Sequence, residues 1–309
     1  MTESRTISRD DLELYINSHR KALRARQMKE KLPAPLQMSL KPLGELLKAT
    51  IDLSGLDLKQ MNLQLIDLSG AILRNTDLRG ATLSGAKLCD TDMQGAKLRR
   101  AVFQETDFSR ADMRGIEIQD AQFIDCNFEH ANLEEVNFQR SKVAGGNFSH
   151  SQLNGSKWAS ADLRGIDFNH AQLHYADFRE ANLASSSFEH AELNDAQFMK
   201  AVCTNCKFKN SSAPKVNFSN ATLNSIDATA AKWPDAKMKG SVLKDAAFIK
   251  ADLRNADLRT HFLNANFTHA QLEGSNSAGA IMENAILTGT VLEIHKSERL
   301  VGALKRIVT

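Results

Sequence analysis

The chain has 309 residues, a net charge of +2 and a charged fraction of 25%. A net charge this close to zero gives no strong attraction to nucleic acid, so we expect no direct nucleic-acid partner. No apolar run approaches membrane-spanning length, and the first residues lack the charged-then-apolar leader of an exported protein. With only four cysteines, we expect a cytoplasmic protein and no membrane partner, although leaderless secretion stays open.

Residues 1–50 differ in pattern from the rest and are assigned as a helical N-terminal extension and cap. Ser8 followed by Asp11 resembles a capping box, and apolar residues at helical spacing predict an amphipathic helix over residues 9–31. Its basic second half is either a solvated face or a docking site for an acidic partner. Pro33 and Pro35 end this helix, and residues 43–47 predict a short helical turn that caps the next segment.

Residues 51–294 follow a five-residue repeat. Clear examples are Ala161-Asp162-Leu163-Arg164-Gly165 and Ala176-Asp177-Phe178-Arg179-Glu180. A small residue is followed by a polar residue, usually Asp or Asn, then by a large apolar centre and two mostly polar residues. Helical repeats, leucine-rich repeats and propeller blades all have much longer periods, so none of them explains this spacing.

This pattern resembles that of the pentapeptide-repeat proteins, whose motif is A(D/N)Lxx. The resemblance covers about four-fifths of the chain. It implies an all-β fold, a right-handed four-sided (quadrilateral) parallel β-helix with one pentad per side and twenty residues per coil. At that length the solenoid has about twelve coils, stacked at a strand spacing of ~4.8 Å. Centres and small residues both point inwards, where a small partner leaves room for a larger one.

Large apolar centres predict the composition of the core. Phenylalanines recur every ten residues along residues 168–218, which places them on two opposite sides of the coil: Phe168, Phe178, Phe188, Phe198, Phe208 and Phe218. We expect all six rings to be buried. Ala213 is an unusually small centre, and we expect the indole of Trp233, one coil later, to fill the space that it leaves, with Pro234 exposed. The repeat loses one residue, which we assign to the unit His261 to Asn264.

The tail, residues 295–309, predicts a C-terminal capping or dimerisation helix. Ser297 can cap it, and its apolar stripe is Leu300, Val301, Leu304, Ile307 and Val308. A stripe this apolar must be buried against the last coil or against a second copy. The family resemblance likewise implies a homodimer through this helix.

Candidate chemistry is sparse. Cys203-x-x-Cys206 suggests a metal or redox pair, but both residues fall at inward positions and no second ligand pair follows, so we predict buried free thiols. Cys126 is also predicted to point inwards, and Cys89 outwards. The recurrent Asp and Asn residues are expected to hydrogen-bond turn backbone. No phosphate loop, nucleophile elbow or zinc motif occurs, so we expect no catalytic residue, cofactor or metal, and no enzyme.

One set of residues rises above the repeat background. Four histidines are spaced twenty residues apart and a fifth follows in the same local phrase: His130, His150, His170, His190 and His269. With twenty residues per coil, the first four share one edge. His269 follows His190 by 79 residues, four coils less the lost residue, and should rejoin that edge. This histidine ladder is either a relic of duplication or a binding surface, a pH-sensitive strip or an adventitious metal site.

These features predict a non-enzymatic protein-interaction scaffold whose partner is another protein of unknown identity. Two alternatives stay open from the resemblance. The first is a DNA-mimic protector or inhibitor of DNA gyrase, like the quinolone-resistance members of the family. Residues 101–200 hold 16 acidic and 8 basic residues, which suits a DNA mimic, but residues 201–250 hold 8 basic and 3 acidic. The second is a secretion-system effector or type VI secretion accessory protein.

Overall fold

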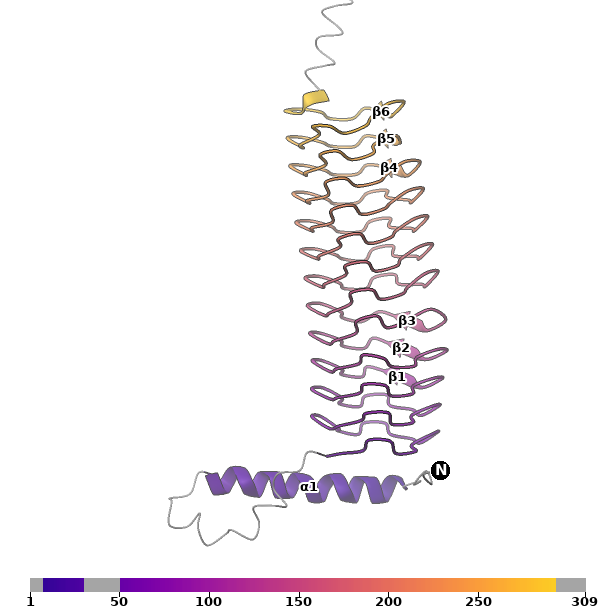
Figure 1. The fold of residues 1–309 in the computed structure, drawn as a ribbon, viewed down its shortest axis with the longest axis vertical. Coiled ribbons are helices and arrows are strands. Elements are labelled where there is room, and N and C mark those ends of the chain that lie inside the picture. The colour runs from indigo at the N-terminus through magenta and orange to yellow at the C-terminus, as the bar shows by residue number, and fades with distance from the viewer. Residues whose placement is uncertain (1–7, 31–50, 293–309) are drawn as a thin grey trace, which may run out of the picture.

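The computed structural model describes residues 8–30 and 51–292 and is an all-β parallel solenoid with little helix (Figure 1). In chain order its elements are α1 (Arg9–Glu30), β1 (Val102–Gln104), β2 (Gln122–Ile124), β3 (Lys142–Ala144), β4 (Val242–Lys244), β5 (His261–Leu263) and β6 (Ile281–Glu283). The expected features at Pro33, Pro35, residues 43–47 and residues 295–309 lie outside the described residues. Within the described part, no helix combines the length and apolarity needed to cross a membrane.

Backbone pairing repeats every twenty residues along the solenoid. Strand β2 lies parallel between β1 and β3, with Phe103 opposite Phe123 and Phe123 opposite Val143. Isolated bridges continue the pattern on every side of the coil, at Asp52↔Ile72, Asp57↔Asp77, Asn62↔Thr82 and Asp67↔Lys87. Each turn of twenty residues therefore has four bridge-forming positions. Coils satisfy the backbone groups of their neighbours, and residues twenty apart lie in one column.

Most pentads end in a tight turn whose fifth residue is left-handed. The N–H of Ala131 donates to the carbonyl of Phe128 at 2.9 Å, and His130 between them has φ 59°. Apart from glycine, the residues with positive φ have values of 52° to 66°, and no Val, Ile or Thr is among those described. A β-branched side chain crowds a left-handed backbone. The polar second residue supports the turn as predicted, since the N–H of Asn169 donates to Asp167 Oδ1 at 2.8 Å.

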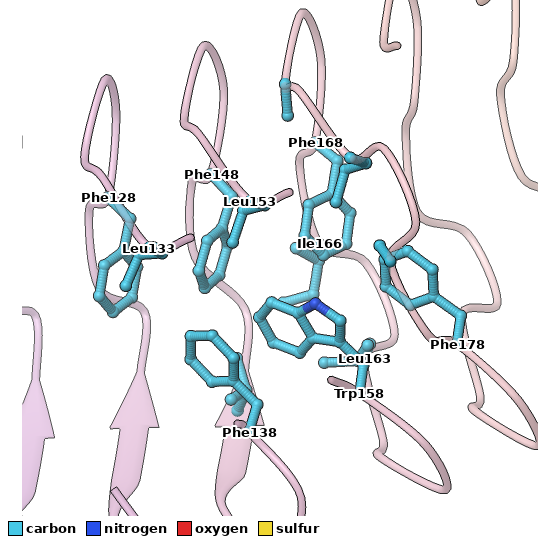
Figure 2. Close-up of a cluster of buried hydrophobic side chains, with 14 of the residues drawn as sticks. Phe128, Leu133, Phe138, Phe148, Leu153, Trp158, Leu163, Ile166, Phe168 and Phe178 are labelled. Atoms are coloured by element: carbon cyan, nitrogen blue, oxygen red, sulfur yellow. The ribbon is translucent and has the colours of Figure 1, made fainter. Parts of the chain in front are cut away.

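The phenylalanine core is confirmed. All six predicted rings have no exposed surface. Phe168, Phe188 and Phe208 stack on successive coils with ring centroids 5.0 and 4.9 Å apart. Phe178, on the opposite side, meets Phe168 and Phe188 edge to face at 5.8 Å. Figure 2 shows the same arrangement around Phe148, where two columns of rings from opposite sides of the coil interdigitate.

Two tryptophans take centre positions in this core. Trp233 is fully buried as predicted, with its ring 5.2 Å from Phe208 and 5.0 Å from Phe218. Its Nε1–H donates to Ser211 Oγ at 3.0 Å. The expected exposure of Pro234 is wrong: this residue is half-buried, because Pro214 occupies the same position on the preceding coil and Lys215 N–H donates to the Pro234 carbonyl at 2.9 Å.

Trp158 is the second tryptophan at a centre position, and the sequence analysis makes no prediction for it. Its indole stacks on Phe138 at 3.8 Å and its Nε1–H donates to Ser156 Oγ at 2.7 Å (Figure 2). In both cases a serine at a small inward position accepts the indole N–H. The signal that could have revealed this pairing is the replacement of the usual alanine by serine near a tryptophan centre.

The place of the lost residue differs from the expectation. Thr260 is buried and begins a complete five-residue side, in which β5 pairs with β4 through Val242↔His261 and Leu243↔Phe262. The shortened unit is therefore the preceding one, Ala256 to Arg259. The N–H of Thr260 donates to the carbonyl of Leu258 at 2.8 Å, so this corner closes without the left-handed fifth residue. The sequence pattern places Thr260 at the polar fifth position of a pentad because threonine resembles a turn residue. In the structure it takes the small inward position instead.

Helix α1 lies across the N-terminal end of the solenoid (Figure 1). The capping box is present, with Asp11 N–H donating to Ser8 Oγ at 3.1 Å and Ser8 Oγ–H donating to Asp11 Oδ2 at 2.6 Å. Leu12 and Ile16 are buried as part of the core. Arg9 donates to the Asn62 carbonyl at 2.8 Å, a group on the first described coil.

Truncating a stacked ring is expected to be costly. Phe188→Ala should lower the free energy of unfolding by about 3–5 kcal/mol, because it leaves a cavity between two packed rings that cannot collapse. Phe188→Leu is the control and should cost less than about 1.5 kcal/mol, since Leu is already common at centres. Denaturant unfolding measures both. Equal, small losses in the two variants would contradict the stacked core.

The left-handed corners make a second stability prediction. Gly165 has φ +69°, and a Cβ added there would meet nothing within 4 Å. Gly165→Val should therefore destabilise the fold through the backbone alone, by about 1–2 kcal/mol, whereas Gly165→Asn should cost far less because Asn tolerates this conformation. Thermal unfolding of the two variants tests the difference. Equal stabilities would show that the corner is not held left-handed.

Candidate interaction surface: the histidine column

The structure brings four of the five candidate histidines together on one corner of the solenoid. Ring centroids lie 4.8 Å apart for His130 and His150, 4.6 Å for His150 and His170, and 4.7 Å for His170 and His190. The last two pairs are nearly parallel, with interplanar angles of 4° and 1°. His130 is half-buried and the other three are exposed. Together these four residues form the histidine column.

Backbone register produces this column. Every member is the left-handed fifth residue of a pentad, with φ between 58° and 60°. Each backbone N–H donates to the following coil, as His150 does to the Asn169 carbonyl at 2.9 Å and His170 to the Glu189 carbonyl at 2.9 Å. Side chains that leave the corner in the same direction on adjacent coils must stack at the strand spacing.

His269 occupies the same corner further along but does not touch the other histidines. Between His190 and His269 the corner is occupied by Asn210, Ala230 and Lys250, as the bridges Asp227↔Ala247 and Ala247↔Asn266 indicate. Asn210 Nδ2 lies 3.3 Å from His190 Nε2 and ends the stack. The shortened unit at Ala256–Arg259 accounts for the offset of 79 residues. His269 therefore shares the register of the column without sharing its ring contacts.

Burial and close spacing make His170 difficult to charge. Burial lowers the pKa of His170 below its ordinary value of 6.5, and the neighbouring His150 and His190 lower it further, while Asp167 and Glu189 act in the opposite direction. At one end, His130 Nε2 lies 3.9 Å from Glu129 Oε1, close enough for an ion pair when the ring is protonated. Neutral rings can stack closely, whereas adjacent imidazolium charges repel one another.

The cysteines are free thiols with structural positions. Cys203 and Cys206 are fully buried, and Cys206 Sγ–H donates to the Leu183 carbonyl at 2.9 Å. Burial, and then the neighbouring Cys206, raises the pKa of Cys203, and burial raises that of Cys126 to about 11. Cys89 was expected to be exposed but is half-buried, because its Sγ–H donates to Ser69 Oγ at 3.1 Å on the preceding coil.

A second polar cluster, which the repeat pattern does not predict, is formed by His174, Glu192 and Asn194. His174 Nε2 lies 3.0 Å from Glu192 Oε2, and its buried Nδ1 has no hydrogen-bond partner; the buried Asn194 Oδ1 has none either. These residues come from adjacent coils, Glu192 eighteen and Asn194 twenty residues after His174, so only the twenty-residue period could have indicated the cluster. Within residues 8–30 and 51–292, no three His, Cys, Asp or Glu side chains are grouped to hold a metal ion.

Arginine two residues after aspartate neutralises many of the acidic positions. Both groups leave the same side of the coil, as in Asp112–Arg114, Asp162–Arg164 and Asp177–Arg179, with N–O distances of 2.7, 2.8 and 2.7 Å. The hydrogen bond from Arg114 holds the pKa of Asp112 below its ordinary value, and Arg164 does the same for Asp162. Acidic residues in the middle of the solenoid are thus interrupted by paired cations.

These features define a repeat protein of the parallel β-solenoid class. The family model described as "Pentapeptide repeat region" matches residues 101–178 and 171–258, and that for "Pentapeptide repeats (8 copies)" matches residues 51–88, 77–115 and 260–293. The chain therefore belongs to the pentapeptide-repeat family.

Solved structures of the family are similar to this chain, with low overall superposition. HetL, a pentapeptide-repeat protein involved in heterocyst differentiation regulation from the cyanobacterium Nostoc sp. strain PCC 7120, is 22% identical over 78% of this chain and 89% of its own, with a TM-score of 0.19. QnrB1, a plasmid-mediated fluoroquinolone resistance protein, is 20% identical over 80% and 99%, with a TM-score of 0.26. A pentapeptide-repeat protein of the Arabidopsis thaliana thylakoid lumen is 28% identical over 38% and 68%, with a TM-score of 0.26. The comparison with curated proteins gave no match.

The lowered pKa of His170 predicts how this ring titrates. Because the unfolded chain binds more protons there than the folded chain, this group should make the free energy of unfolding fall as the pH drops below about 6.5. Replacing both neighbours, in His150→Asn with His190→Asn, should raise the pKa of His170 part of the way back, since burial remains. NMR titration of the His170 ring measures this. An unchanged midpoint in the double variant would show that the rings are not electrostatically coupled.

Proposed function

We propose that this protein is a non-enzymatic scaffold that presents columns of side chains to another protein, and that the histidine column, together with His269, is its contact surface. The observation that carries this proposal is the stack of four imidazoles at 4.6 to 4.8 Å on an outward corner. Stacked rings are already restricted in their rotamers. A partner that binds them therefore loses less side-chain entropy than it would on isolated exposed histidines.

The shape of the corner supports a binding role over catalysis. Catalytic histidines work in concave sites that exclude water, where neighbouring groups hold different protonation states. His150, His170 and His190 project instead from successive convex turns and are exposed. Neutral imidazole offers one donor and one acceptor per ring, so the column suits a partner strand or loop with alternating polar groups.

The finer architecture belongs to the same proposal. We infer a right-handed, four-sided β-helix of about twelve coils over residues 51–294, with α1 as its N-terminal cap and residues 295–309 as a capping or dimerisation helix. Four bridge-forming positions per twenty residues support the four sides. Burial of Leu12 and Ile16 with the core supports the cap. A cytoplasmic location and a homodimer are part of this proposal.

A second candidate function is protection or inhibition of DNA gyrase by mimicry of DNA. The excess of acidic residues over residues 101–200, 16 against 8 basic, favours it. The paired arginines count against it, since DNA presents an unbroken row of one negative charge per ~1.7 Å. A gyrase supercoiling assay with and without quinolone tests this candidate: protection or inhibition at stoichiometric protein supports it, and unchanged supercoiling contradicts it.

The scaffold proposal is tested by comparing two sets of corner residues. His150→Asn with His170→Asn changes the column, and Glu135→Asn with Tyr175→Asn changes two residues on another corner with the same left-handed backbone. Asn tolerates this backbone, so both variants should fold. Proteins captured from the native organism by the wild type and identified by mass spectrometry should be lost in the column variant alone. Equal retention, or equal loss in both variants, would contradict the assignment.

A further inference from the structure

Basic side chains gather in a surface depression near the N-terminal end of the solenoid. Its volume is about 440 Å³, and it is lined by Lys59, Gln60, Arg79, Gly80, Arg99 and Arg100. Four of these six residues carry a positive charge. Gln60, Gly80 and Arg100 are fifth residues of their pentads, as the histidines are, but they lie on a different corner of the coil, so the depression is separate from the histidine column.

Backbone register stacks these cations on three successive coils. Asp57 pairs with Asp77, and Asp77 with Lys97, so the residues two positions later, Lys59, Arg79 and Arg99, form one column. Adjacent members are therefore one strand spacing apart, ~4.8 Å along the axis. The three side chains leave the same side of three coils, and all of them line the depression.

Gly80 creates the hollow between the cations. It occupies the corner position between Gln60 and Arg100 on the neighbouring coils. A Cβ built on Gly80 would lie 3.5 Å from Gln60 Cγ, an ordinary van der Waals contact, and apart from its chain neighbours it would meet no other atom within 4 Å. Its φ of +68° is left-handed, as at most corners of the solenoid. A ligand at this point can approach the backbone directly.

Charge is unbalanced at this site because the aspartate–arginine pairing breaks down. Lys59 is bound to Asp57 at 2.8 Å, and Arg79 makes two hydrogen bonds to Asp77 at 2.8 and 2.7 Å. On the next coil Lys97 occupies the position equivalent to that of Asp77. Arg99 therefore lacks the carboxylate that Arg114, Arg164 and Arg254 each have two residues earlier.

No ion pair of Arg99 or Arg100 is recorded among the described residues, and both are exposed. This side of the three coils has a local excess of three positive charges. It carries five basic residues and two acidic ones, namely Lys59, Arg79, Lys97, Arg99 and Arg100 against Asp57 and Asp77. The following coil bounds the site with Glu117 and with Asp120, which Arg140 binds at 3.0 Å.

We propose that this depression binds a small, multiply charged phosphate compound, either a polyphosphate or a phosphate ester. Guanidinium groups donate in a planar fork that matches phosphate oxygens, and several cations on adjacent coils match several phosphate charges at once. The volume is in the range of small-molecule sites. Because the site is open to solvent, its affinity depends strongly on salt.

Calorimetric titration of the full chain with tripolyphosphate at low salt tests this site. Arg99→Gln with Arg100→Gln should weaken binding by at least roughly tenfold, since each removes charge-assisted hydrogen bonds. Arg164→Gln with Arg254→Gln removes the same total charge elsewhere and should leave the affinity within about twofold of the wild type. Absence of binding to the wild type, or equal weakening by the two double variants, would overturn the proposal.

Two substitutions at the hollow separate charge from shape. Gly80→Asp and Gly80→Asn add side chains of nearly the same size, and both tolerate the left-handed backbone. Gly80→Asp should weaken tripolyphosphate binding several-fold more than Gly80→Asn. Equal effects of the two variants would show that the cations around Gly80 do not bind the ligand. Citrate, titrated into the wild type, should bind more weakly than tripolyphosphate, and equal affinity would overturn the assignment to phosphate chemistry.

Discussion

Parallel backbone pairing between residues twenty apart is the constraint on which every other feature of this protein depends. It brings Asp57 next to Asp77 and Phe103 next to Phe123, and each coil satisfies the hydrogen bonds of the next. Each coil of a solenoid contacts only its neighbours, and the pairing repeats along the body with one change, to nineteen residues across the shortened unit Ala256–Arg259. The inward Phe168–Phe188 stack and the outward His150–His170 stack are two products of one spacing, 5.0 and 4.6 Å between rings.

This register places the side chains of one repeat position next to each other on successive coils, so their properties add up along a column. A large apolar centre repeated on successive coils gives a continuous core, whereas a histidine repeated on four coils lowers the pKa of His170 through burial and like charge. Aspartate and arginine two residues apart neutralise each other on the same coil, as Asp162 and Arg164 do. The surface is therefore a set of columns, each with its own charge, and binding properties follow from where a column changes its residue type.

The repeated features could be predicted from the sequence and the exceptions could not. Buried phenylalanines, the shared edge of His130 to His190 and the turn-supporting aspartates follow directly from period five and period twenty. The shortened unit was assigned one unit too late, because Thr260 can serve either as a polar corner residue or as a small inward one, and only pairing with Ser241 and its coil decides. The half-burial of Cys89 and Pro234 depends on how much of each side chain is covered by the neighbouring residues in its column. The His174–Glu192 contact depends on side-chain rotamers that a repeat pattern does not specify.

The register itself is tested most directly by disulfide trapping. In a Cys89→Ser background, His150→Cys with His170→Cys places two thiols on adjacent coils, where the strand spacing of ~4.8 Å lies within the range that a disulfide bridges. His150→Cys with Gly165→Cys, fifteen residues apart, places them on different corners. Mild oxidation followed by thiol counting and peptide mapping should find a bond between positions 150 and 170 and none between 150 and 165. A bond between 150 and 165, with none between 150 and 170, would contradict the twenty-residue register and with it the histidine column.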